Sequence, residues 1–318
     1  MLLFIYETII MQERHENRNI YFKELSITSR NYFIPYIQCW HAIEARMNVL
    51  EIGCGDGGNL LPFSEMGCNT IGVDMAKSRI KDAKNFFNVH HAEGEFIASD
   101  IFKLKELEQN FDIIICHDVF EHITEKELFL SNLSKYLKPQ GIVFMSFPAW
   151  QMPFGGHQQI CRNRILSYLP FIHLFPVSIY RSILKAFRAD TDCIKELLSI
   201  KKTGVSIELF ERLVQKTNLI IQNRQLWFIN PHYKIKFGLS PRQLNQTISG
   251  IPYLRNFAST SCFYILKTNK TKQDIKRLCQ NSYKQKVTLA TIICDEGDPI
   301  ERGVLTQAPI YKISIILL

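Results

Sequence analysis

The stretch Asn48-Val-Leu-Glu-Ile-Gly-Cys-Gly-Asp-Gly-Gly-Asn-Leu60 decides the fold of this chain. Val49, Leu50 and Ile52 form a short apolar run of the kind that a buried parallel strand needs, and four glycines then interrupt it. Glycine is required where the backbone takes a positive φ, or where a ligand comes closer than a Cβ would allow. Residues 59–66 look helical, so their free N–H groups would point back at the turn. The stretch predicts a strand, turn and helix that hold a nucleotide-like cofactor.

Two classes of cofactor compete for this turn. Gly53-x-Gly55-x-x-Gly58 matches the dinucleotide fingerprint, and Asp74 follows at about the 20-residue distance expected of a ribose-binding acid. The same residues also read Glu51-x-Gly53-x-Gly55-x-Gly57, with an acid inside the strand. This second pattern resembles the opening motif of class I S-adenosylmethionine-dependent methyltransferases. The rest of the chain has to distinguish the two.

Length and composition set the outer limits. The chain has 318 residues and a mass of 37.0 kDa, enough for one large α/β domain with insertions or for two smaller domains. A net charge of +8 indicates mild attraction to anionic partners such as phosphorylated glycolipids, a membrane surface or nucleic acid. An ordinary basic protein is the simpler interpretation, because no dense block of Lys and Arg interrupts the core segments.

The nine cysteines point to a reducing compartment. Their number is odd, they are scattered, and none are spaced C-x-x-C, which argues against a disulfide framework and against a zinc site. We therefore expect a cytoplasmic protein without a bound metal. No window reaches the roughly 20 apolar residues of a membrane span.

Strand and helix patterns alternate along the chain with short connections, which predicts a parallel, doubly wound α/β sheet. The predicted strands are 49–52, 69–74, 95–100, 111–116, 141–147, 219–229 and 261–267, and the clearest helices are 75–88 and 206–218. Residues 111–116 are nearly all aliphatic, as expected of a strand buried on both faces.

Two long segments combine aromatic and basic residues. They are 148–204, inserted after the fifth predicted strand, and 230–260. Connections of this length are usually functional, so both are candidates for a lid and for substrate contacts. Amphipathic helices resting on a membrane would have the same composition.

The methyltransferase resemblance extends through several motifs in the expected order. It implies that Asp74 accepts from the ribose hydroxyls, and that Asp100 and the N–H of Ile101 hold the adenine. Residues 111–122 and 137–141 resemble further segments of the family. The full set of cofactor-binding candidates is Glu51, Gly53, Cys54, Gly55, Gly57, Asn59, Asp74, Met75, Asp100, Ile101 and His117. A short-chain dehydrogenase would need Tyr-x-x-x-Lys, and no tyrosine in the chain has lysine four residues later.

Two histidines are the candidate catalytic residues. Transfer of a methyl group to a hydroxyl or amine requires that the acceptor loses a proton, best to a group that titrates near neutrality. His122 follows the fourth predicted strand and His157 lies in the insertion. A structural role for His122, at a helix start or in the core, is an equal alternative. Both surroundings resemble methyltransferases of small molecules, lipids or quinones. The Asn/Asp-Pro-Pro-Tyr/Phe signature of base-amine methylation is missing, so a nucleic-acid substrate is disfavoured.

These observations predict a Rossmann-like, doubly wound, seven-stranded methyltransferase sheet with an inserted lid after the fifth strand. The expected division is an N-terminal extension at 1–30, the methyltransferase domain at 31–268 and a tail at 269–318. The expected function is methyl transfer from S-adenosyl-L-methionine to O or N of a small or lipid-linked biosynthetic substrate, with peripheral membrane contact as a further expectation. An NAD-dependent oxidoreductase and a non-catalytic cofactor-binding protein stay open as alternatives.

Overall fold

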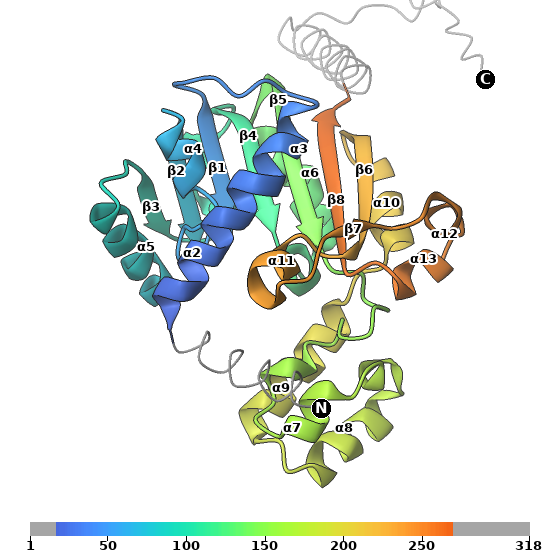
Figure 1. The fold of residues 1–318 in the computed structure, drawn as a ribbon. Coiled ribbons are helices and arrows are strands. Elements are labelled where there is room, and N and C mark those ends of the chain that lie inside the picture. Colours follow the sequence, from blue (N-terminus) through green and yellow to red (C-terminus); the bar gives the residue numbers. More distant parts are fainter. Residues whose placement is uncertain (1–16, 270–318) are drawn as a thin grey trace, which may run out of the picture. The chain divides into compact units, whose positions relative to one another are not determined.

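A mixed sheet of eight strands forms the centre of the computed structural model, which describes residues 17–269 (Figure 1). The strand order is β3-β2-β1-β4-β5-β8-β6-β7. The strands are β1 (Asn48–Ile52), β2 (Asn69–Asp74), β3 (Glu95–Ala98), β4 (Phe111–His117), β5 (Leu137–Phe147), β6 (Leu219–Ile229), β7 (Arg242–Gln243) and β8 (Ser261–Thr268). Strands β1 to β5 pair in parallel, and β8 lies antiparallel between β5 and β6. The predicted doubly wound sheet is confirmed, and the antiparallel β8 makes it a mixed sheet.

The number of strands is a small correction to the prediction. The sheet has eight strands instead of seven, because the two-residue β7 pairs with the end of β6, where Trp227 lies opposite Gln243. Residues 242 and 243 are both polar and exposed, so they have no apolar pattern that would mark them as a strand.

Helices cover both faces of the sheet, as alternation along the strands requires. On β4, Ile113 and Ile115 pack against one layer of helices, and Ile114 and Cys116 pack against the other. The first layer holds α2 (Arg18–Thr28), α3 (Ile34–Gln38), α4 (Leu61–Glu65) and α5 (Lys77–Val89), and the second holds α6 (Lys126–Tyr136) and α10 (Ile207–Gln215). The prediction that this strand is buried on both faces is confirmed.

The insertion folds as a small helical subdomain with its own hydrophobic core. It contains α7 (Arg164–Tyr168), α8 (Val177–Ala186) and α9 (Thr191–Thr203), together with short 3₁₀ turns at Gln158–Ile160 and Ile172–Leu174. Its core consists of Cys161, Leu166, Ile172, Tyr180, Leu184, Cys193 and Leu197. The subdomain extends from the edge at which β5 ends (Figure 1). It therefore adjoins the edge where ligands bind in sheets of this kind.

Two further segments lie at this edge. The connection between β6 and β8 carries α11 (His232–Phe237), α12 (Gln246–Gly250) and α13 (Leu254–Phe257). Helix α2 falls in the segment assigned to an N-terminal extension, and it runs through a π-helical turn at Ser29–Phe33 into α3. Within residues 17–269, no helix has both the length and the apolar character needed to cross a bilayer. The predicted C-terminal tail, residues 269–318, lies outside the described part of the chain except for Asn269.

Candidate cofactor and acceptor site

The glycine turn after β1 has one open face. Gly53, Gly55 and Gly57 have positive φ values of 71°, 51° and 81°. A Cβ at Gly53 would come within 2.3 Å of the Val119 side chain, and one at Gly57 would come within 2.8 Å of the Phe96 ring. A Cβ at Gly55 would meet no atom within 4 Å. Protein therefore packs against Gly53 and Gly57, whereas Gly55 is where a ligand could approach the backbone.

Asp74, the last residue of β2, fixes this turn. Its Oδ2 accepts a hydrogen bond from the Gly55 N–H at 2.9 Å, and its Oδ1 accepts one from the Ala76 N–H at 2.8 Å. Each carboxylate oxygen keeps a further lone pair for a ligand hydroxyl. Met75 follows and is 80% exposed, so a large apolar side chain lies uncovered beside the turn. The predicted ribose acid thus lies directly against the open glycine.

Glu51 and Asn59 form a buried pair with unused acceptors. Oε1 of Glu51 accepts a hydrogen bond from Nδ2 of Asn59 at 2.7 Å. Oε2 of Glu51 and Oδ1 of Asn59 have no hydrogen-bond partner in the described part of the chain, although Glu51 is only 1% exposed. Burial raises the pKa of Glu51 to about 8, and the bond from Asn59 opposes the rise. Orphaned buried acceptors are costly, and the ammonium group of an amino-acid moiety would satisfy them.

Helix α2 packs against the outer side of the glycine turn after β1. Asp56 is completely buried and forms ion pairs with Arg18 of α2 and with Arg79 of α5. A Cβ at Gly58 would come within 2.6 Å of the Phe22 carbonyl oxygen, so the α2 backbone sits directly on the turn. The sequence does not predict these contacts, because nothing local pairs Arg18 with an acid 38 residues away.

Two tyrosines near Asp118 were also missed. The Arg18 guanidinium lies 4.7 Å from the centroid of the Tyr21 ring. Burial, reinforced by the charge of Asp118, raises the pKa of Tyr21, and the same two causes raise the pKa of Tyr233 in α11 to about 12. Both phenols therefore stay protonated at neutral pH and can donate hydrogen bonds. Their spacing in the sequence carries no signal, because α2 and α11 are brought together only by the fold.

The predicted adenine residues follow β3. Oδ1 of Asp100 accepts a hydrogen bond from the Phe102 N–H at 3.1 Å, so this carboxylate caps the 3₁₀ turn Ile101–Lys103. Ile101 is 4% exposed, and its carbonyl accepts from the Tyr136 hydroxyl at 2.8 Å. Asp100 is half-buried at the same edge as Asp74. The structure thus places both acids at neighbouring strand ends.

Cys54 and His117 turn their side chains into the protein. A Cβ built at Gly72 would come within 2.8 Å of Cys54 Sγ, so only the backbone of Cys54 is available to a ligand. His117 ends β4, lies 3.2 Å from Ser146 Oγ through Nδ1, and packs its ring 4.9 Å from that of Phe33. Its side chain is only 7% exposed. The side chains of Cys54 and His117 therefore pack inside the protein, behind the site, and do not face it.

The two candidate histidines meet beside a buried acid. The ring centroids of His122 and His157 are 5.3 Å apart, and Nε2 of His122 lies 3.9 Å from Oε1 of Glu121. Each of the three residues offers a ligand atom within 4.8 Å of the others. Neither oxygen of Glu121 has a hydrogen-bond partner among residues 17–269, although this residue is 3% exposed. The insertion therefore delivers His157 to the end of β4.

The pKa values of the two imidazoles, His122 and His157, indicate different roles. Burial, and then the neighbouring His122, lower the pKa of His157 to about 4. Burial also lowers the pKa of His122, but Asp118 opposes this effect. A group with a pKa near 4 is a weak proton acceptor at neutral pH, so His122 is the better candidate base. The two rings and Glu121 are donor types that divalent metals favour, so the group could also hold a cation. Burial raises the pKa of Glu121 and so opposes the charged form that a cation would need.

Comparison with known proteins identifies the domain. Residues 43–167 match a family described as "Methyltransferase domain". The ubiquinone biosynthesis O-methyltransferase of Bartonella bacilliformis is 32% identical over 123 residues, which cover 37% of this chain and 50% of that protein. The protein of the same name from Rickettsia akari is 29% identical over 102 residues, which cover 32% of this chain and 40% of that one. The chain thus spans at most about half the length of these two relatives.

A solved structure of a plantazolicin methyltransferase aligns over 84% of this chain and 97% of its own, with 14% identity and a TM-score of 0.47. The matched family and the sheet are the evidence for the kind of domain. The classic dinucleotide-binding order is 3-2-1-4-5-6 with parallel strands, whereas here the antiparallel β8 lies between β5 and β6. The glycine turn and this strand order agree with the match of residues 43–167 to the methyltransferase-domain family.

Proposed function

We propose that the protein transfers a methyl group from S-adenosyl-L-methionine to an oxygen or nitrogen atom of a small or lipid-linked biosynthetic substrate. The observation that carries the proposal is the turn after β1, where unused acceptors of Glu51 and Asn59 lie on the same motif as the open face of Gly55. These groups fit the amino-acid part of this cofactor. The names of the relatives, ubiquinone biosynthesis O-methyltransferases, support an oxygen acceptor on a quinone-type ring.

Each binding residue has a part in this proposal. Asp74 would accept hydrogen bonds from the ribose hydroxyls while it holds Gly55. Glu51 would receive the amino group, and Asp100 with Ile101 would hold the adenine. When bound, the cofactor supplies an electrophilic methyl group for in-line displacement, so the protein has mainly to orient the acceptor and exclude water.

The acceptor would bind around Asp118. After burial, the charge of Asp118 raises the pKa of Tyr21 and Tyr233 further, and it opposes the lowered pKa of His122 and His157. Two phenol donors beside a neutral imidazole suit a hydroxylated ring: the donors orient its oxygens, and His122 takes the proton of the hydroxyl that is methylated.

The first test is calorimetric titration of the full chain with S-adenosylhomocysteine and, in parallel, with NADH. We expect micromolar binding of the first and none of the second. Binding of NADH alone would favour the oxidoreductase alternative. An acceptor screen with radiolabelled S-adenosylmethionine and hydroxylated benzoates or quinols follows. If the cofactor binds but no acceptor is labelled, the non-catalytic alternative is favoured.

The proposal includes a cytoplasmic location and peripheral contact with a membrane. The seven cysteines within the described residues are all free thiols, which suits a reducing compartment. A lipid-linked acceptor would reside in a bilayer, so the enzyme would have to reach that surface.

A further inference from the structure

We propose that the exposed side of α8, α12 and α13 is a docking surface for a bilayer that contains anionic lipids. The surface itself does not depend on the methyltransferase proposal. Its use for collecting a lipid-linked acceptor does rest on that proposed function.

A strip of large apolar side chains is exposed on these helices and the turns beside them. We call it the apolar strip. Its members are between 36% and 69% exposed, and they are Phe171, Phe175, Val177, Ile179, Ile248, Ile251, Tyr253, Leu254 and Phe257. Scattered apolar residues on a surface need no explanation, but a contiguous group of this size marks an interaction site.

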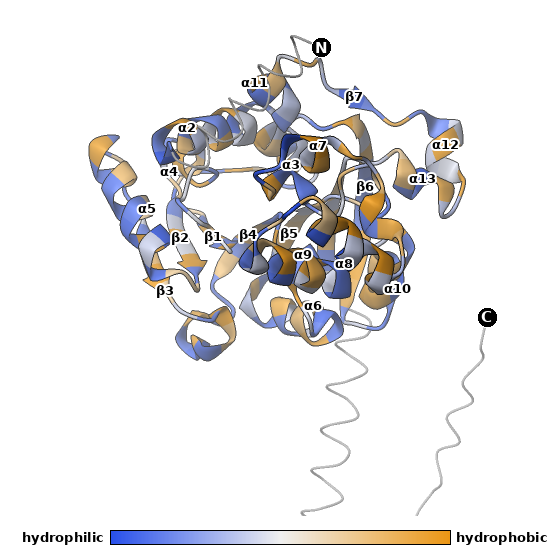
Figure 2. Cartoon of the chain, turned by 90° about the horizontal axis from the view of Figure 1, so that it is seen from below, coloured by the Kyte–Doolittle hydropathy of each residue, from blue (hydrophilic) through white to orange (hydrophobic). Residues whose placement is uncertain are grey.

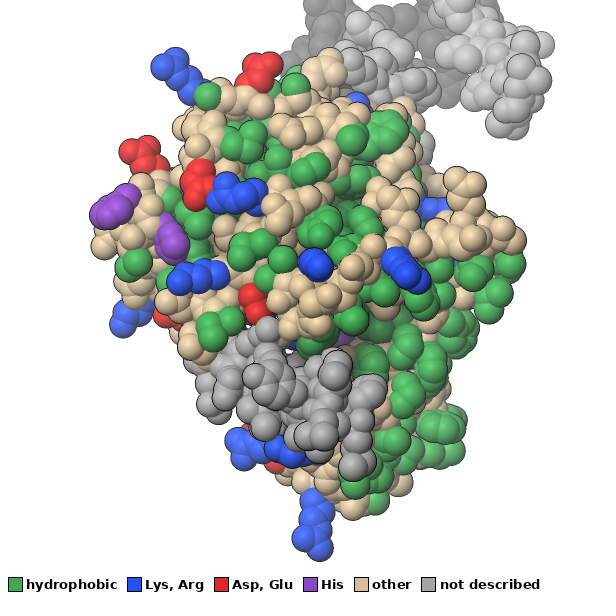
Figure 3. Space-filling view, viewed as in Figure 1, with side chains coloured by type: hydrophobic (Ala, Val, Ile, Leu, Met, Phe, Trp, Pro, Cys, Tyr) green, Lys and Arg blue, Asp and Glu red, His purple; other side chains and the backbone are tan. Residues whose placement is uncertain are grey.

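The two halves of the strip are continuous in space although they are far apart in the sequence. The rings of Phe171 from the insertion and Phe257 from α13 lie with their centroids 6.3 Å apart. In the space-filling view, hydrophobic side chains run down the right-hand side from the region of α12 and α13 to that of α8 (Figure 3). Seen from below, these helices lie towards the same side of the molecule (Figure 2). The strip is therefore one surface.

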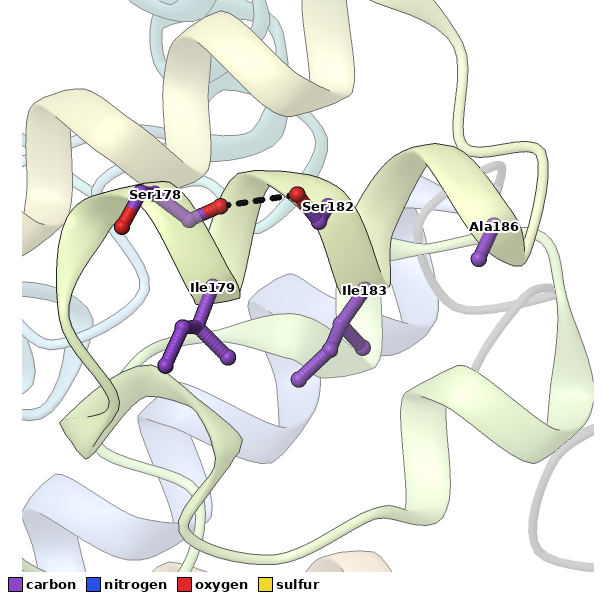
Figure 4. A pocket seen from close by; sticks show the side chains of 5 residues that line it. All are labelled: Ser178, Ile179, Ser182, Ile183 and Ala186. Atoms are coloured by element: carbon purple, nitrogen blue, oxygen red, sulfur yellow. Dashed lines mark hydrogen bonds between the residues drawn. The ribbon is translucent and has the colours of Figure 1, made fainter.

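Helix α8 has the form of a helix that lies in an interface. Tyr180 and Leu184 point into the core of the insertion. Its outer side is a shallow groove of about 420 Å³ lined by Ser178, Ile179, Ser182, Ile183 and Ala186, in which the Ser182 hydroxyl donates to the Ser178 carbonyl (Figure 4). Small residues on the outer side, with Ile179 on one flank and Arg181 and Lys185 on the other, would let the helix settle between head groups.

The charge around the strip selects the partner. The sequence contains no Asp or Glu between residues 128 and 189, or between residues 212 and 269. Arg181 and Lys185 lie on α8 itself. Further basic residues occur in the same two stretches of sequence: Arg162, Arg164 and Arg188 in the insertion, and Lys234, Lys236 and Arg242 before α12. A second copy of this face would bring like charges together, whereas anionic head groups complement them. An anionic bilayer is therefore the occupant that fits both the apolar and the basic groups.

The surface is joined to the catalytic side through the insertion. The Phe171 N–H donates to the Pro153 carbonyl at 2.7 Å, and Nε2 of Gln158 donates to the Leu169 carbonyl at 2.8 Å. These bonds tie the turn that carries His157 to the segment that carries Phe171. An acceptor that leaves the bilayer at this strip would enter beside His157.

The test is co-sedimentation of the full chain with vesicles of phosphatidylcholine alone, and with vesicles that contain about 30 mol% phosphatidylglycerol. We expect binding to the anionic vesicles that weakens as salt is added. The double variant Ile179→Glu/Leu254→Glu should bind at least tenfold more weakly. Val89→Glu is the matched control, because Val89 is 70% exposed at the end of α5, which packs against β2 and β3 at the opposite end of the sheet order. It should bind as the parent does.

Three results would overturn the inference: no binding of the parent chain to anionic vesicles, equal binding by the double variant, or equal loss in Val89→Glu. A dimer in solution that the double variant dissociates, without vesicle binding by the parent, would assign the strip to self-association instead. Affinity for S-adenosylhomocysteine is measured on the same samples. Because vesicle binding requires no cofactor, failure of the proposed function and failure of this inference give different results.

Discussion

The carboxylate of Asp74 accepts a hydrogen bond from the backbone N–H of Gly55 across 2.9 Å. The bond joins the end of β2 to the turn after β1, so one side chain both shapes the turn and faces the space beside it. This relationship links the geometry of the turn to the affinity for a cofactor, and it can be tested by substitution.

Asp74→Ala should weaken the binding of S-adenosylhomocysteine by about 1.5 to 3 kcal/mol, roughly 10- to 150-fold, because a charged acceptor for the ribose hydroxyls is lost. Calorimetric titration gives the affinity. Asp192→Ala is the control, since the Asp192 side chain is 91% exposed in the insertion. Unchanged affinity in a folded Asp74→Ala protein would refute the assignment.

Gly55→Ala and Gly53→Ala should differ in their effects: the first should mainly weaken cofactor binding, and the second should mainly lower stability. A Cβ at Gly55 meets no protein atom within 4 Å, so Gly55→Ala should lose only about 1 to 2 kcal/mol of stability from its positive φ, yet bind cofactor much more weakly. Gly53→Ala forces a Cβ to within 2.3 Å of Val119 and should destabilise the fold more. Urea unfolding and calorimetry separate the two effects. Tight cofactor binding by Gly55→Ala would show that the open face is not used.

Glu51 should make the free energy of unfolding depend on pH. Burial raises its pKa from 4.5 to about 8, so the folded protein keeps a proton that the unfolded chain releases between these values. Stability should therefore fall as the pH rises through this window, by up to about 1.4 kcal/mol per pH unit. Glu51→Gln should flatten the profile in urea unfolding between pH 5 and 8. Substitution of the exposed Glu125 by Gln should leave it unchanged, and parallel profiles for Glu51→Gln and the parent would contradict the assignment.

Binding of the cofactor should release a proton from Glu51. An ammonium group beside Oε2 favours the charged carboxylate, so the pKa of Glu51 should fall on binding. At pH 7, the apparent binding enthalpy of S-adenosylhomocysteine should then vary with the ionisation enthalpy of the buffer, and Glu51→Gln should lose this dependence. The same buffer dependence in Glu51→Gln would place the proton elsewhere.

His122→Asn should reduce methyl transfer by roughly 10²- to 10⁴-fold with little change in cofactor affinity, as expected for loss of a general base. Because burial lowers the pKa of His122, the parent rate should stay level through neutral pH and decline only in acidic buffer. His157→Asn should have a smaller effect, and His91→Asn, at an exposed position, should have none. A chelator should leave the rate unchanged; loss of activity that added divalent metal restores would assign His122 to metal binding instead.

The sheet could be predicted from the sequence because each strand has a local apolar signal. The bounds of β2 and β6 agree with the prediction to the residue. Differences arise where side chains end or extend a strand: β3 stops at Ala98, since the Asp100 carboxylate accepts from Phe102 and starts a 3₁₀ turn. The fold of the insertion could not be predicted, because helices as short as the five-residue α7 have too few turns to show a period.

The candidate site also has parts that the sequence predicts and parts that it does not. The turn and the acids at the strand ends follow from local motifs, and the structure brings His122 and His157 together. Contacts between distant segments left no pattern in the sequence. No predicted role falls on Asp56, between Gly55 and Gly57, yet it is completely buried and paired with Arg18 and Arg79. Side chains whose role depends on a partner far along the chain become visible only in three dimensions.

The position of α2 has a consequence for turnover. Its backbone rests on Gly58 and its Arg18 is paired with Asp56, so the helix covers the turn from outside the sheet. A cofactor seated on the turn would then be held by a backbone whose shape depends on this helix. The residence time of the spent cofactor would then be governed by an ion pair in the helix that precedes the sheet, and the release of product could set the pace of the whole cycle.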